Sequence, residues 1–305
     1  MSIFNRRPFI LRDIKDKISI IIPDKLYLSI LFRYHMGYWL DWKNLRTFNE
    51  KLQWLKLYNQ NPLYTKLVDK FEVKKIVADI IGNEFIIPTI ALYNSADEID
   101  FDQLPSKFVL KCTHDSGSII VCKDKAVFDK KAAITILNRS LRRNHFWFWR
   151  EWPYKNVKPR IIAEEFVEDQ NDGELRDYKF YCFNGRPYSL LLATDRLNKD
   201  SCLCFDYYDM NFNHLDLTNH WHPNAKVIPH KPIHFEEMKK LAEKLSFNIP
   251  VVRVDFYEAN GRVYFGEMTF FDMGGFLKIH PDDWDMEWGS MITLPKKDNE
   301  NSICS

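Results

Sequence analysis

The chain lacks the glycine-rich motifs with which many nucleotide-binding proteins hold phosphate groups. Neither GxGxxG after a strand nor GxxxxGK[ST] occurs anywhere in its 305 residues. A nucleotide bound by this protein therefore needs another kind of loop. An excess of charge is missing too, because 43 Lys and Arg residues stand against 42 Asp and Glu residues. This balance gives no general case for a nucleic-acid partner, and we expect none.

Long apolar runs are also absent. The most apolar stretch near the start, SIIIPDKLYLSILF, is broken by Pro23, Asp24 and Lys25, so it is too short to span a membrane. The first residues carry charges where a secretory signal needs an apolar core. We therefore expect a cytoplasmic protein. The run Ile20–Phe32 is interpreted as a packed helix, with a peripheral contact at the inner face of the membrane as the alternative.

The six cysteines show no CxxC spacing, and several of them lie in runs typical of strands. This pattern favours reduced thiols in the core of a cytosolic protein. The alternative is a zinc site built from Cys202 and Cys204 with His220 and His222, although Cys-x-Cys is not the usual structural spacing.

Helical and strand signals alternate along the chain without a repeated βαβ pattern. Thr47 and Glu50 form a capping box at the start of a helix. Asn-Gly pairs at 184–185 and 260–261 indicate hairpins. Further helices are predicted at 66–81, 129–143 and 234–246, and further strands at 85–90, 107–111 and 160–167. The pattern is typical of a mixed fold with antiparallel sheets.

The hairpin at 251–275 carries acids in otherwise apolar strands. An odd-length loop would bring Asp255 and Glu267 onto one face with Arg253 beside them, whereas a two-residue loop would place them on opposite faces. Two facing carboxylates repel each other unless a cation lies between them, and oxygen ligands suit Mg²⁺ bound to a phosphate. The alternative is a solvent-facing strand surface with ordinary charges.

A second informative stretch runs from Phe108 to Val121. An apolar strand ends at Lys111, a polar loop of small residues follows, and a second apolar strand comes after it. Such a loop can turn backbone N–H groups toward an anion, and the lysine adds a point charge. The alternative is an edge-strand lysine followed by an ordinary turn.

With these stretches the chain resembles the ATP-grasp superfamily. Within it, the chain resembles the TupA-like branch associated with teichuronopeptide and surface-polysaccharide biosynthesis. The resemblance covers most of the chain from about residue 33 to 288. It is carried by TFNEKLQWLKLYNQNPLYTKLVDKFEV, FVLKCTHDSGSIIVCKD, REWPYKNVKPRIIAEEFVED, DYKFYCFNGRPY and VRVDFYEANGRVYFGEMTFF. It implies an α+β ATP-grasp fold, in which two subdomains with antiparallel sheets clasp ATP after an N-terminal helical region. The implied boundaries are 1–65, 66–163, 164–295 and a tail at 296–305.

The resemblance also implies a role for each matching position. Arg253 would stabilise the developing oxyanion, and Lys111 would take part in catalysis as well as in binding. Mg²⁺ would be held by Asp255 and Glu267, with Thr269 where the superfamily usually has Asn. The residues implied to hold ATP are Lys70, Lys111, His114, Ser116, Gly117, Ser118, Glu164, Glu165, Phe166, Val167, Asp177 and Lys179.

The implied activity is that of an ATP-dependent carboxylate–amine ligase. It would join an amino acid or other amine to a sugar acid of a surface polysaccharide, such as a capsule or O-antigen, or to its precursor, through an acylphosphate. One alternative is a glycosyltransferase, supported by the D-x-D sequence of Asp283 and Asp285. Others are a kinase that uses the same ATP site and a catalytically silent binding module. The aromatic residues Trp147, Trp149, Trp152 and Tyr154 either stack on sugars or, as we prefer, lie in the core.

Overall fold

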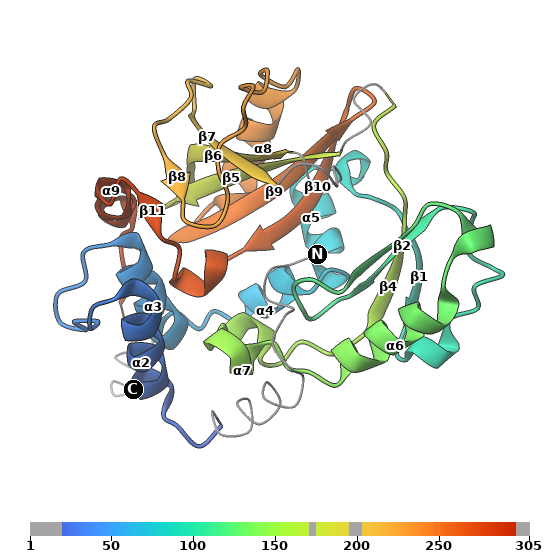
Figure 1. Ribbon diagram of the computed structural model, residues 1–305, viewed down its shortest axis with the longest axis horizontal. Coiled ribbons are helices and arrows are strands. Elements are labelled where there is room, and N and C mark those ends of the chain that lie inside the picture. Colours follow the sequence, from blue (N-terminus) through green and yellow to red (C-terminus); the bar gives the residue numbers. More distant parts are fainter. Residues whose placement is uncertain (1–19, 171–174, 195–202, 297–305) are drawn as a thin grey trace. The chain divides into compact units, whose positions relative to one another are not determined.

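The computed structural model describes residues 20–170, 175–194 and 203–296. These residues form two compact units. Unit 1 comprises the described residues within Met1–Leu40, Lys56–Glu72 and Pro88–Phe166, and unit 2 comprises those within Asp41–Leu55, Val73–Ile87 and Val167–Ser305. Each unit contains an antiparallel sheet with helices (Figure 1). The predicted α+β class is therefore confirmed.

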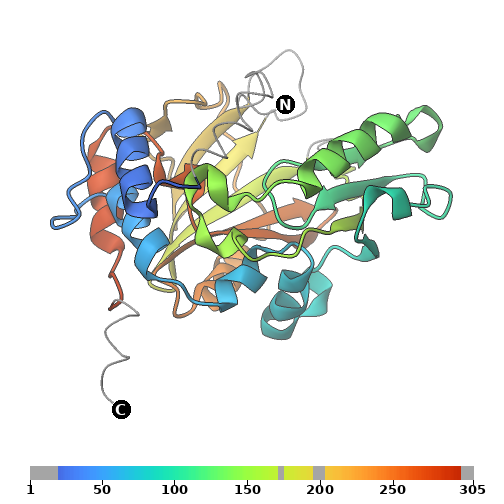
Figure 2. The same ribbon diagram turned by 90° about the horizontal axis from the view of Figure 1, so that it is seen from below.

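Unit 1 is built on a four-stranded sheet. Its strands lie in the order β1 (Thr89–Tyr93), β4 (Ile161–Glu165), β2 (Phe108–Cys112) and β3 (Ile119–Cys122), and every neighbouring pair is antiparallel. One face of the sheet is covered by α6 (Lys130–Leu141), as Figure 2 shows. Alternate residues of β2 and β4 point into this core beside Leu137, as the period of two in a strand requires. The opposite face is left for the polar residues Lys111 and Glu164.

The remaining elements of unit 1 are helical. They are α2 (Asp24–Met36), α4 (Leu63–Val68), α7 (Phe146–Trp149) and the short 3₁₀ turns η3 (Ala96–Glu98), η4 (Lys125–Val127) and η5 (Trp152–Tyr154). Trp152 is buried and its ring lies 6.1 Å from that of Tyr64. The guanidinium of the buried Arg150 lies over the ring of Trp147. Trp152 is therefore a core residue, as predicted, whereas Trp147, Trp149 and Tyr154 are only half-buried.

The prediction of one continuous helix at 66–81 is wrong, because the segment contains parts of two helices. The chain leaves α4 at Asp69, whose backbone is extended, and α5 (Glu72–Ile81) begins three residues later. The Asp69 carboxylate accepts hydrogen bonds from the N–H groups of Phe71 and Glu72 and so caps α5. Lys70 consequently lies in the short link between two helices, not within one.

Unit 2 is built on a five-stranded antiparallel sheet. The order is β10 (Arg262–Thr269), β9 (Val251–Ala259), β5 (Arg176–Phe183), β6 (Arg186–Thr194) and β7 (Cys204–Asp209). The helix α8 (Phe235–Ser246) covers one face, where the ring of Phe180 contacts those of Phe235 and Phe256. The other face carries the polar residues of the hairpin and is partly covered by Trp288 of α9 (Asp283–Met291), which packs on Tyr181.

The other elements of unit 2 are shorter. They are η2 (Asn83–Phe85), η6 (Asp272–Gly275) and the two-stranded ladder of β8 (Thr218–Asn219) and β11 (Ile279–His280). The helix α3 (Phe48–Tyr58) begins where the capping box predicted. The Thr47 hydroxyl accepts the N–H of Glu50 at 3.2 Å, and the Glu50 carboxylate accepts the N–H of Thr47 at 2.9 Å. Helices predicted at 129–143 and 234–246 are confirmed as α6 and α8.

The four cysteines within the described ranges, Cys112, Cys122, Cys182 and Cys204, are buried free thiols, as predicted. Cys202, on which the zinc alternative depends, lies outside those ranges. His222 Nδ1 donates a hydrogen bond to the carbonyl oxygen of Leu203 at 3.2 Å. In residues 20–170, 175–194 and 203–296, no helix is both long and apolar enough to cross a membrane.

Candidate functional site

The polar face of the unit 2 sheet carries all three residues of the predicted metal site. Lys179 on β5, Asp255 on β9 and Glu267 on β10 lie directly opposite one another across three neighbouring strands. Tyr181, Arg253 and Thr269 form the next row in the same direction. Directly opposed residues share a face of an antiparallel sheet, and so do residues two apart along a strand. The sheet therefore gathers two acids and two cations on a single surface.

The loop length that we required for this arrangement is wrong. The hairpin turns through two residues, Asn260 and Gly261, both with positive φ, and Ala259 pairs with Arg262. A regular ladder after such a turn would place Glu267 on the opposite face. Instead the register shifts between Phe265 and Glu267, where Gly266 is the extra residue of a β-bulge. The bulge supplies the odd residue that we had assigned to the loop.

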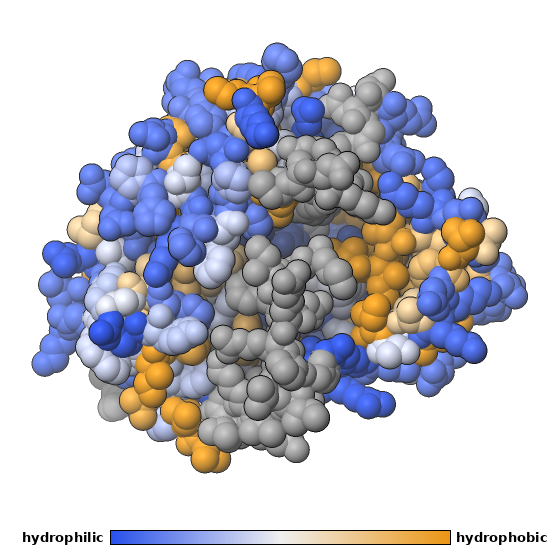
Figure 3. Space-filling model, viewed as in Figure 1, coloured by the Kyte–Doolittle hydropathy of each residue, from blue (hydrophilic) through white to orange (hydrophobic). Residues whose placement is uncertain are grey.

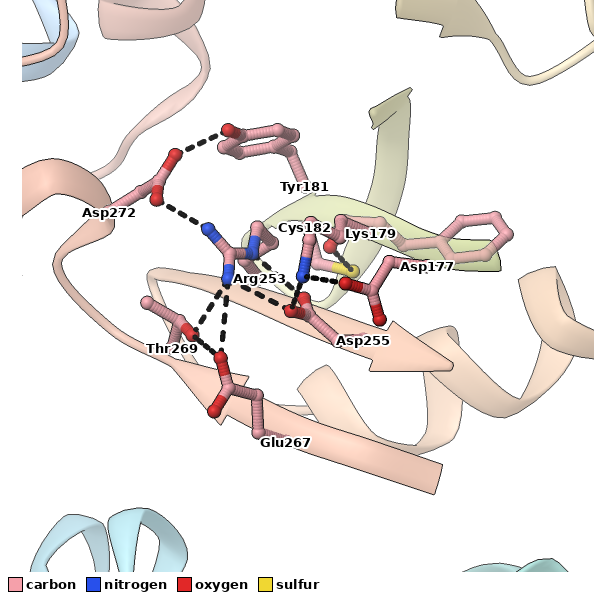
Figure 4. Close-up of polar contacts among 10 residues, drawn as sticks. Asp177, Lys179, Tyr181, Cys182, Arg253, Asp255, Glu267, Thr269 and Asp272 are labelled. Carbon is pink, nitrogen blue, oxygen red and sulfur yellow. Dashed lines mark hydrogen bonds and ion pairs between the residues drawn. The ribbon is translucent and has the colours of Figure 1, made fainter. Parts of the chain in front are cut away.

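Arg253 lies at the centre of this cluster (Figure 4). Its Nε and Nη2 atoms donate to the two oxygens of Asp255 at 2.8 Å each, a bidentate pair. Nη2 also donates to Thr269 Oγ1 at 3.2 Å and to Glu267 Oε1 at 3.4 Å. A single guanidinium thus joins both acids predicted to bind the metal.

Lys179 occupies the other side of Asp255. Its Nζ lies 2.5 Å from Asp255 Oδ2 and 3.4 Å from Asp177 Oδ2. All three residues are buried, with exposed fractions of 8% for Lys179, 1% for Asp255 and 2% for Asp177. Burial alone would raise the pKa of Asp255, but the charges of Arg253 and Lys179 outweigh it and hold this pKa below its ordinary value. Asp255 therefore stays ionised at neutral pH.

Asp272 also belongs to this cluster, although the sequence interpretation did not include it. Its carboxylate accepts a hydrogen bond from Arg253 Nη1 and another from the Tyr181 hydroxyl at 2.5 Å. Burial lowers the pKa of Arg253, yet Asp255 and Asp272 together raise it well above its usual value. The sequence does contain a signal that could have pointed to Asp272, because this acid lies within the apolar run Phe270–Met273, directly before two glycines.

The polar face of the unit 1 sheet brings together two other predicted residues. Lys111 Nζ lies 2.6 Å from Glu164 Oε2. Val109 is the residue directly opposite Glu164, so the lysine two positions further along β2 reaches the acid diagonally. Ile119 and Val121 of β3 are opposite Lys111 and Val109, and they are 51% and 45% exposed. This face therefore combines an ion pair with accessible apolar side chains, and apolar surface gathers over β2 and β4 in Figure 3.

The predicted phosphate loop is held by bonds within itself. Ser118 Oγ donates to Asp115 Oδ1 at 2.6 Å and accepts the N–H of Cys112 at 3.0 Å. The other carboxylate oxygen of Asp115 accepts a hydrogen bond from Ser140 Oγ. Ser116 and Gly117 are exposed at the tip. The structure thus leaves the tip, rather than Ser118, accessible for a phosphate group.

Two further residues of the predicted ATP set lie near this loop. Lys70 Nζ donates to the carbonyl oxygen of Asp115, which places its ammonium at the loop. His114 is only 2% exposed, and its Nε2 lies 3.1 Å from each of the carbonyl oxygens of Ser140 and Arg143. This ring therefore contacts the end of α6 and its C-terminal link.

The predicted hinge lies at the end of β4. Glu164 is buried, Glu165 is exposed, and the Glu165 N–H donates to the carbonyl oxygen of Pro88 at 3.1 Å. The ammonium groups of Lys107 and Lys123 each lie 5.6 Å from the centre of the Phe166 ring. The chain passes from unit 1 to unit 2 between Phe166 and Val167.

The D-x-D sequence does not form a pair of convergent ligands. Asp283 and Asp285 both lie in the first turn of α9, where residues two apart point in different directions. Asp283 is exposed, whereas Asp285 is 9% exposed and its Oδ1 accepts the N–H and Nδ2–H of Asn49 at 3.0 Å each. Asp285 therefore stabilises the start of α3. In the described part of the chain, no three His, Cys, Asp or Glu side chains gather as a group that could hold a metal.

Comparison with known proteins identifies the class. The family described as TupA-like ATPgrasp matches residues 50–293, so this chain belongs to the TupA-like ATP-grasp family. This membership confirms the resemblance inferred from the sequence and the predicted ATP-grasp fold. It places the chain in the ATP-grasp ligase superfamily. No curated protein matches the sequence.

Several solved structures are similar to parts of this chain. The D-alanine–D-alanine ligase of Bacillus anthracis complexed with ATP is 16% identical over 67% of this chain and 55% of that one, with a TM-score of 0.39. The D-alanine–D-alanine ligase of Helicobacter pylori is 17% identical over 75% and 61%, with a TM-score of 0.38. ATP-grasp ligase PsnB complexed with minimal precursor, Mg and ADP is 9% identical over 73% and 57%, with a TM-score of 0.38. The chain spans less than two thirds of each of these structures.

Proposed function

We propose that this protein is an ATP-dependent carboxylate–amine ligase that joins an amino acid or another amine to a sugar acid of a surface polysaccharide or of its precursor. Family membership supports the use of ATP. The observation that carries the proposal is the cluster of Arg253, Asp255 and Glu267 on one face of the unit 2 sheet. It places a fixed cation beside two acids, as phosphoryl transfer to an anionic acceptor requires.

The donor set of unit 2 fits Mg²⁺. Asp255, Glu267 and Thr269 offer only oxygen atoms, and the Glu267 side chain is 39% exposed. With two acids and one hydroxyl, the protein leaves room for water and phosphate oxygens, which is the usual surrounding of Mg²⁺ in nucleotide sites. When bound, Mg²⁺ would neutralise charge on the β- and γ-phosphates of ATP. Arg253 would stabilise negative charge on the acceptor, because Asp255 and Asp272 hold its guanidinium in place from two sides.

Unit 1 would bind the nucleotide itself. Lys111 and Lys70 would contact phosphate oxygens, and the exposed Ile119 and Val121 offer an apolar surface to a purine ring. Glu164 is the ion-pair partner that positions Lys111 on this face. The passage of the chain between units after Phe166 supports a hinge at 164–167. Asp177 would contact the ribose, and its ion pair with Lys179 shows that both belong to the same polar face.

The proposed reaction has two steps. A carboxylate oxygen of the sugar acid attacks the γ-phosphorus of ATP, the bond to the β,γ-bridging oxygen breaks, and ADP leaves. The amine nitrogen then attacks the acyl carbon of the acylphosphate, inorganic phosphate leaves, and the nitrogen loses a proton. The protein supplies no nucleophile; its residues position the reactants and balance their charge.

A product assay tests this proposal. The protein is incubated with ATP, Mg²⁺, uronic-acid nucleotides and pooled amino acids while ADP release and product mass are followed. A ligase releases ADP at its full rate only when both carboxylate and amine are present, and its product is heavier than the sugar acid by one amino acid minus water. UDP release without ATP consumption would indicate a glycosyltransferase instead, and a phosphorylated sugar would indicate a kinase.

A peripheral membrane contact is the second part of the proposal. Along α2, Leu26, Ile30 and Tyr34 recur every four residues and are 53%, 45% and 70% exposed. Ile21 and Trp39 extend this apolar stripe at 82% and 64% exposure, and apolar surface is visible near the start of α2 in Figure 3. Lys25 and Arg33 are the exposed cations along it, which suits anionic lipid. Ile30→Asp should weaken sedimentation with phosphatidylglycerol vesicles, whereas Ile136→Asp on α6 should not; equal sedimentation would contradict the contact. The cytoplasmic location stays a prediction.

A further inference from the structure

The arrangement of Lys179 bears on how many metal ions the site holds. We propose that this chain binds one divalent ion per nucleotide, because the ammonium of Lys179 takes the place that a second cation would need beside Asp255. The inference rests on the proposed ATP and Mg²⁺ site and concerns its composition. It follows from the hydrogen-bonding capacity of Asp255, the burial of Lys179 and the charge of the cluster.

Asp255 has little capacity left for metal ligation. A carboxylate offers about four lone-pair positions. Oδ2 accepts from Lys179 Nζ at 2.5 Å and from Arg253 Nη2 at 2.8 Å, and Oδ1 accepts from Arg253 Nε at 2.8 Å. Three positions are thus taken, and the one that remains, on Oδ1, is enough for a single metal–oxygen bond. An ion bound to Asp255 must therefore obtain its other carboxylate ligand from Glu267.

Lys179 cannot readily give up this position. It lies in the middle of β5, directly opposite Asp255, and its side chain is only 10% exposed. Moving the ammonium away would break its buried ion pairs with Asp255 and Asp177, and breaking a buried ion pair is strongly destabilising. The lysine is therefore a permanent cation of the site.

Glu267 is more exposed and more weakly hydrogen-bonded than Asp255. Its side chain is 39% exposed, and its contacts with Arg253 at 3.4 Å and with Thr269 at 3.3 Å are long. Long contacts to Oε1 are weak and are easily exchanged for a metal–oxygen bond. Glu267 can thus supply the main protein ligand of one ion. The Thr269 hydroxyl already donates a hydrogen bond to Glu267 and accepts one from Arg253, so it is a poor ligand for a second ion.

Lys179 lowers the negative charge that would attract a second ion to this cluster. The carboxylates of Asp177, Asp255, Glu267 and Asp272 are accompanied by the cations Lys179 and Arg253. Four negative and two positive charges leave the protein residues with two negative charges, before those of the nucleotide phosphates are counted. Without Lys179 these residues would carry three net negative charges, and a further cation would be favoured near Asp255 and Asp177.

The test counts metal ions directly. The protein is equilibrated by dialysis with Mn²⁺ and a non-hydrolysable ATP analogue, and bound Mn²⁺ and bound nucleotide are measured per chain. We expect one Mn²⁺ per nucleotide in the unchanged protein and two in Lys179→Met, which keeps the length of the side chain and removes its charge. Two neighbouring Mn²⁺ ions should also broaden the electron paramagnetic resonance spectrum by spin coupling. Lys179→Arg should keep the count at one.

The outcomes separate this inference from the proposed function. Two Mn²⁺ ions in the unchanged protein, or one in Lys179→Met, would overturn the inference while leaving the ATP site in place. Absence of both nucleotide and Mn²⁺ binding would overturn the proposed function itself. If Lys179→Met does not fold, Lys179→Gln, which also removes the positive charge and can still donate a hydrogen bond to Asp255, takes its place, with folding checked by circular dichroism. The count in the unchanged protein decides the inference in either case.

Discussion

Glu267 lies directly opposite Asp255 because one extra residue, Gly266, interrupts the ladder between their strands. The two acids belong to a hairpin whose two-residue turn would otherwise point them to opposite faces. Gly266 fits there because it has no side chain. A Cβ atom at this position would come within 3.0 Å of the Asp255 carbonyl oxygen and 3.1 Å of the Tyr257 ring. The bulge therefore couples a backbone feature to the pairing of two functional side chains.

Gly266→Val should disturb this pairing. The added side chain must displace the backbone of Asp255, so we expect a loss of about 1–3 kcal/mol in the free energy of unfolding. Nucleotide-dependent Mg²⁺ affinity should fall as well, measured by calorimetry. The control is Gly261→Asn in the same hairpin, because no atom lies within 4 Å of the added Cβ and asparagine tolerates positive φ. Equal metal affinity in both variants would show that the bulge is dispensable.

Lys111→Ala should weaken ATP binding or turnover by on the order of a hundredfold or more, as expected when one preorganised charge is removed. The change also removes the ion pair at 2.6 Å with the buried Glu164, so stability must be measured alongside. Lys130→Ala is the matched control, because this lysine is exposed and pairs with Asp102 at 3.2 Å. Unchanged nucleotide affinity and unchanged turnover in Lys111→Ala would remove this residue from the site.

Local sequence signals predicted much of the fold. Both Asn-Gly pairs form hairpin turns, since Asn184, Gly185, Asn260 and Gly261 all adopt the positive φ that these residue types tolerate. The Thr47–Glu50 capping box forms because its two bonds lie within four residues of the chain. The diagonal pair of Lys111 and Glu164 could not be predicted in this way, because it depends on the register between β2 and β4.

Features that depend on distant contacts escaped prediction. The bulge at Gly266 follows from the register of β9 and β10, which periodicity alone does not determine. The break at Asp69 occurs because this carboxylate caps α5 and also accepts from Arg160 Nη2 at 2.8 Å, a partner far along the chain. Asp272 was missed for the same reason, since Tyr181 is 91 residues away.

Glu267→Gln should shift the Mg²⁺ requirement to higher concentrations while the fold stays intact. The change keeps the shape of the side chain but removes a negative charge from the pair of acids, so the attraction for a divalent ion falls. The measurement is ATP turnover, or binding of an ATP analogue, as a function of Mg²⁺ concentration. Glu237→Gln, at an exposed position of α8, is the control. Identical Mg²⁺ curves for Glu267→Gln and the unchanged protein would contradict its role as a ligand.

The stability of the protein should depend on pH through the buried carboxyl group of Asp285. Burial, together with the nearby charge of Glu50, raises the pKa of Asp285 to about 6, although hydrogen bonds from Asn49 partly oppose the shift. The ordinary pKa in an unfolded chain is about 3.9. Because the folded pKa is the higher one, folding favours the protonated carboxyl group. Its contribution to stability is complete below about pH 4 and is lost as the pH rises through about 6.

Asp285→Asn should remove this dependence. Asparagine keeps an oxygen that can accept the N–H and Nδ2–H of Asn49, but it carries no buried charge at neutral pH. We therefore expect a stability close to that of the unchanged protein at about pH 4 and a gain of up to about 3 kcal/mol at about pH 7.5, from a pKa difference of about 2 units. Urea unfolding across this pH range measures the difference between the two proteins. Asp283→Asn, an exposed neighbour in the same helix, should leave the pH dependence unchanged. If the free energy of unfolding of Asp285→Asn varies with pH as it does in the unchanged protein, Asp285 is not the acid that titrates in this window. Another group must then cause the pH dependence.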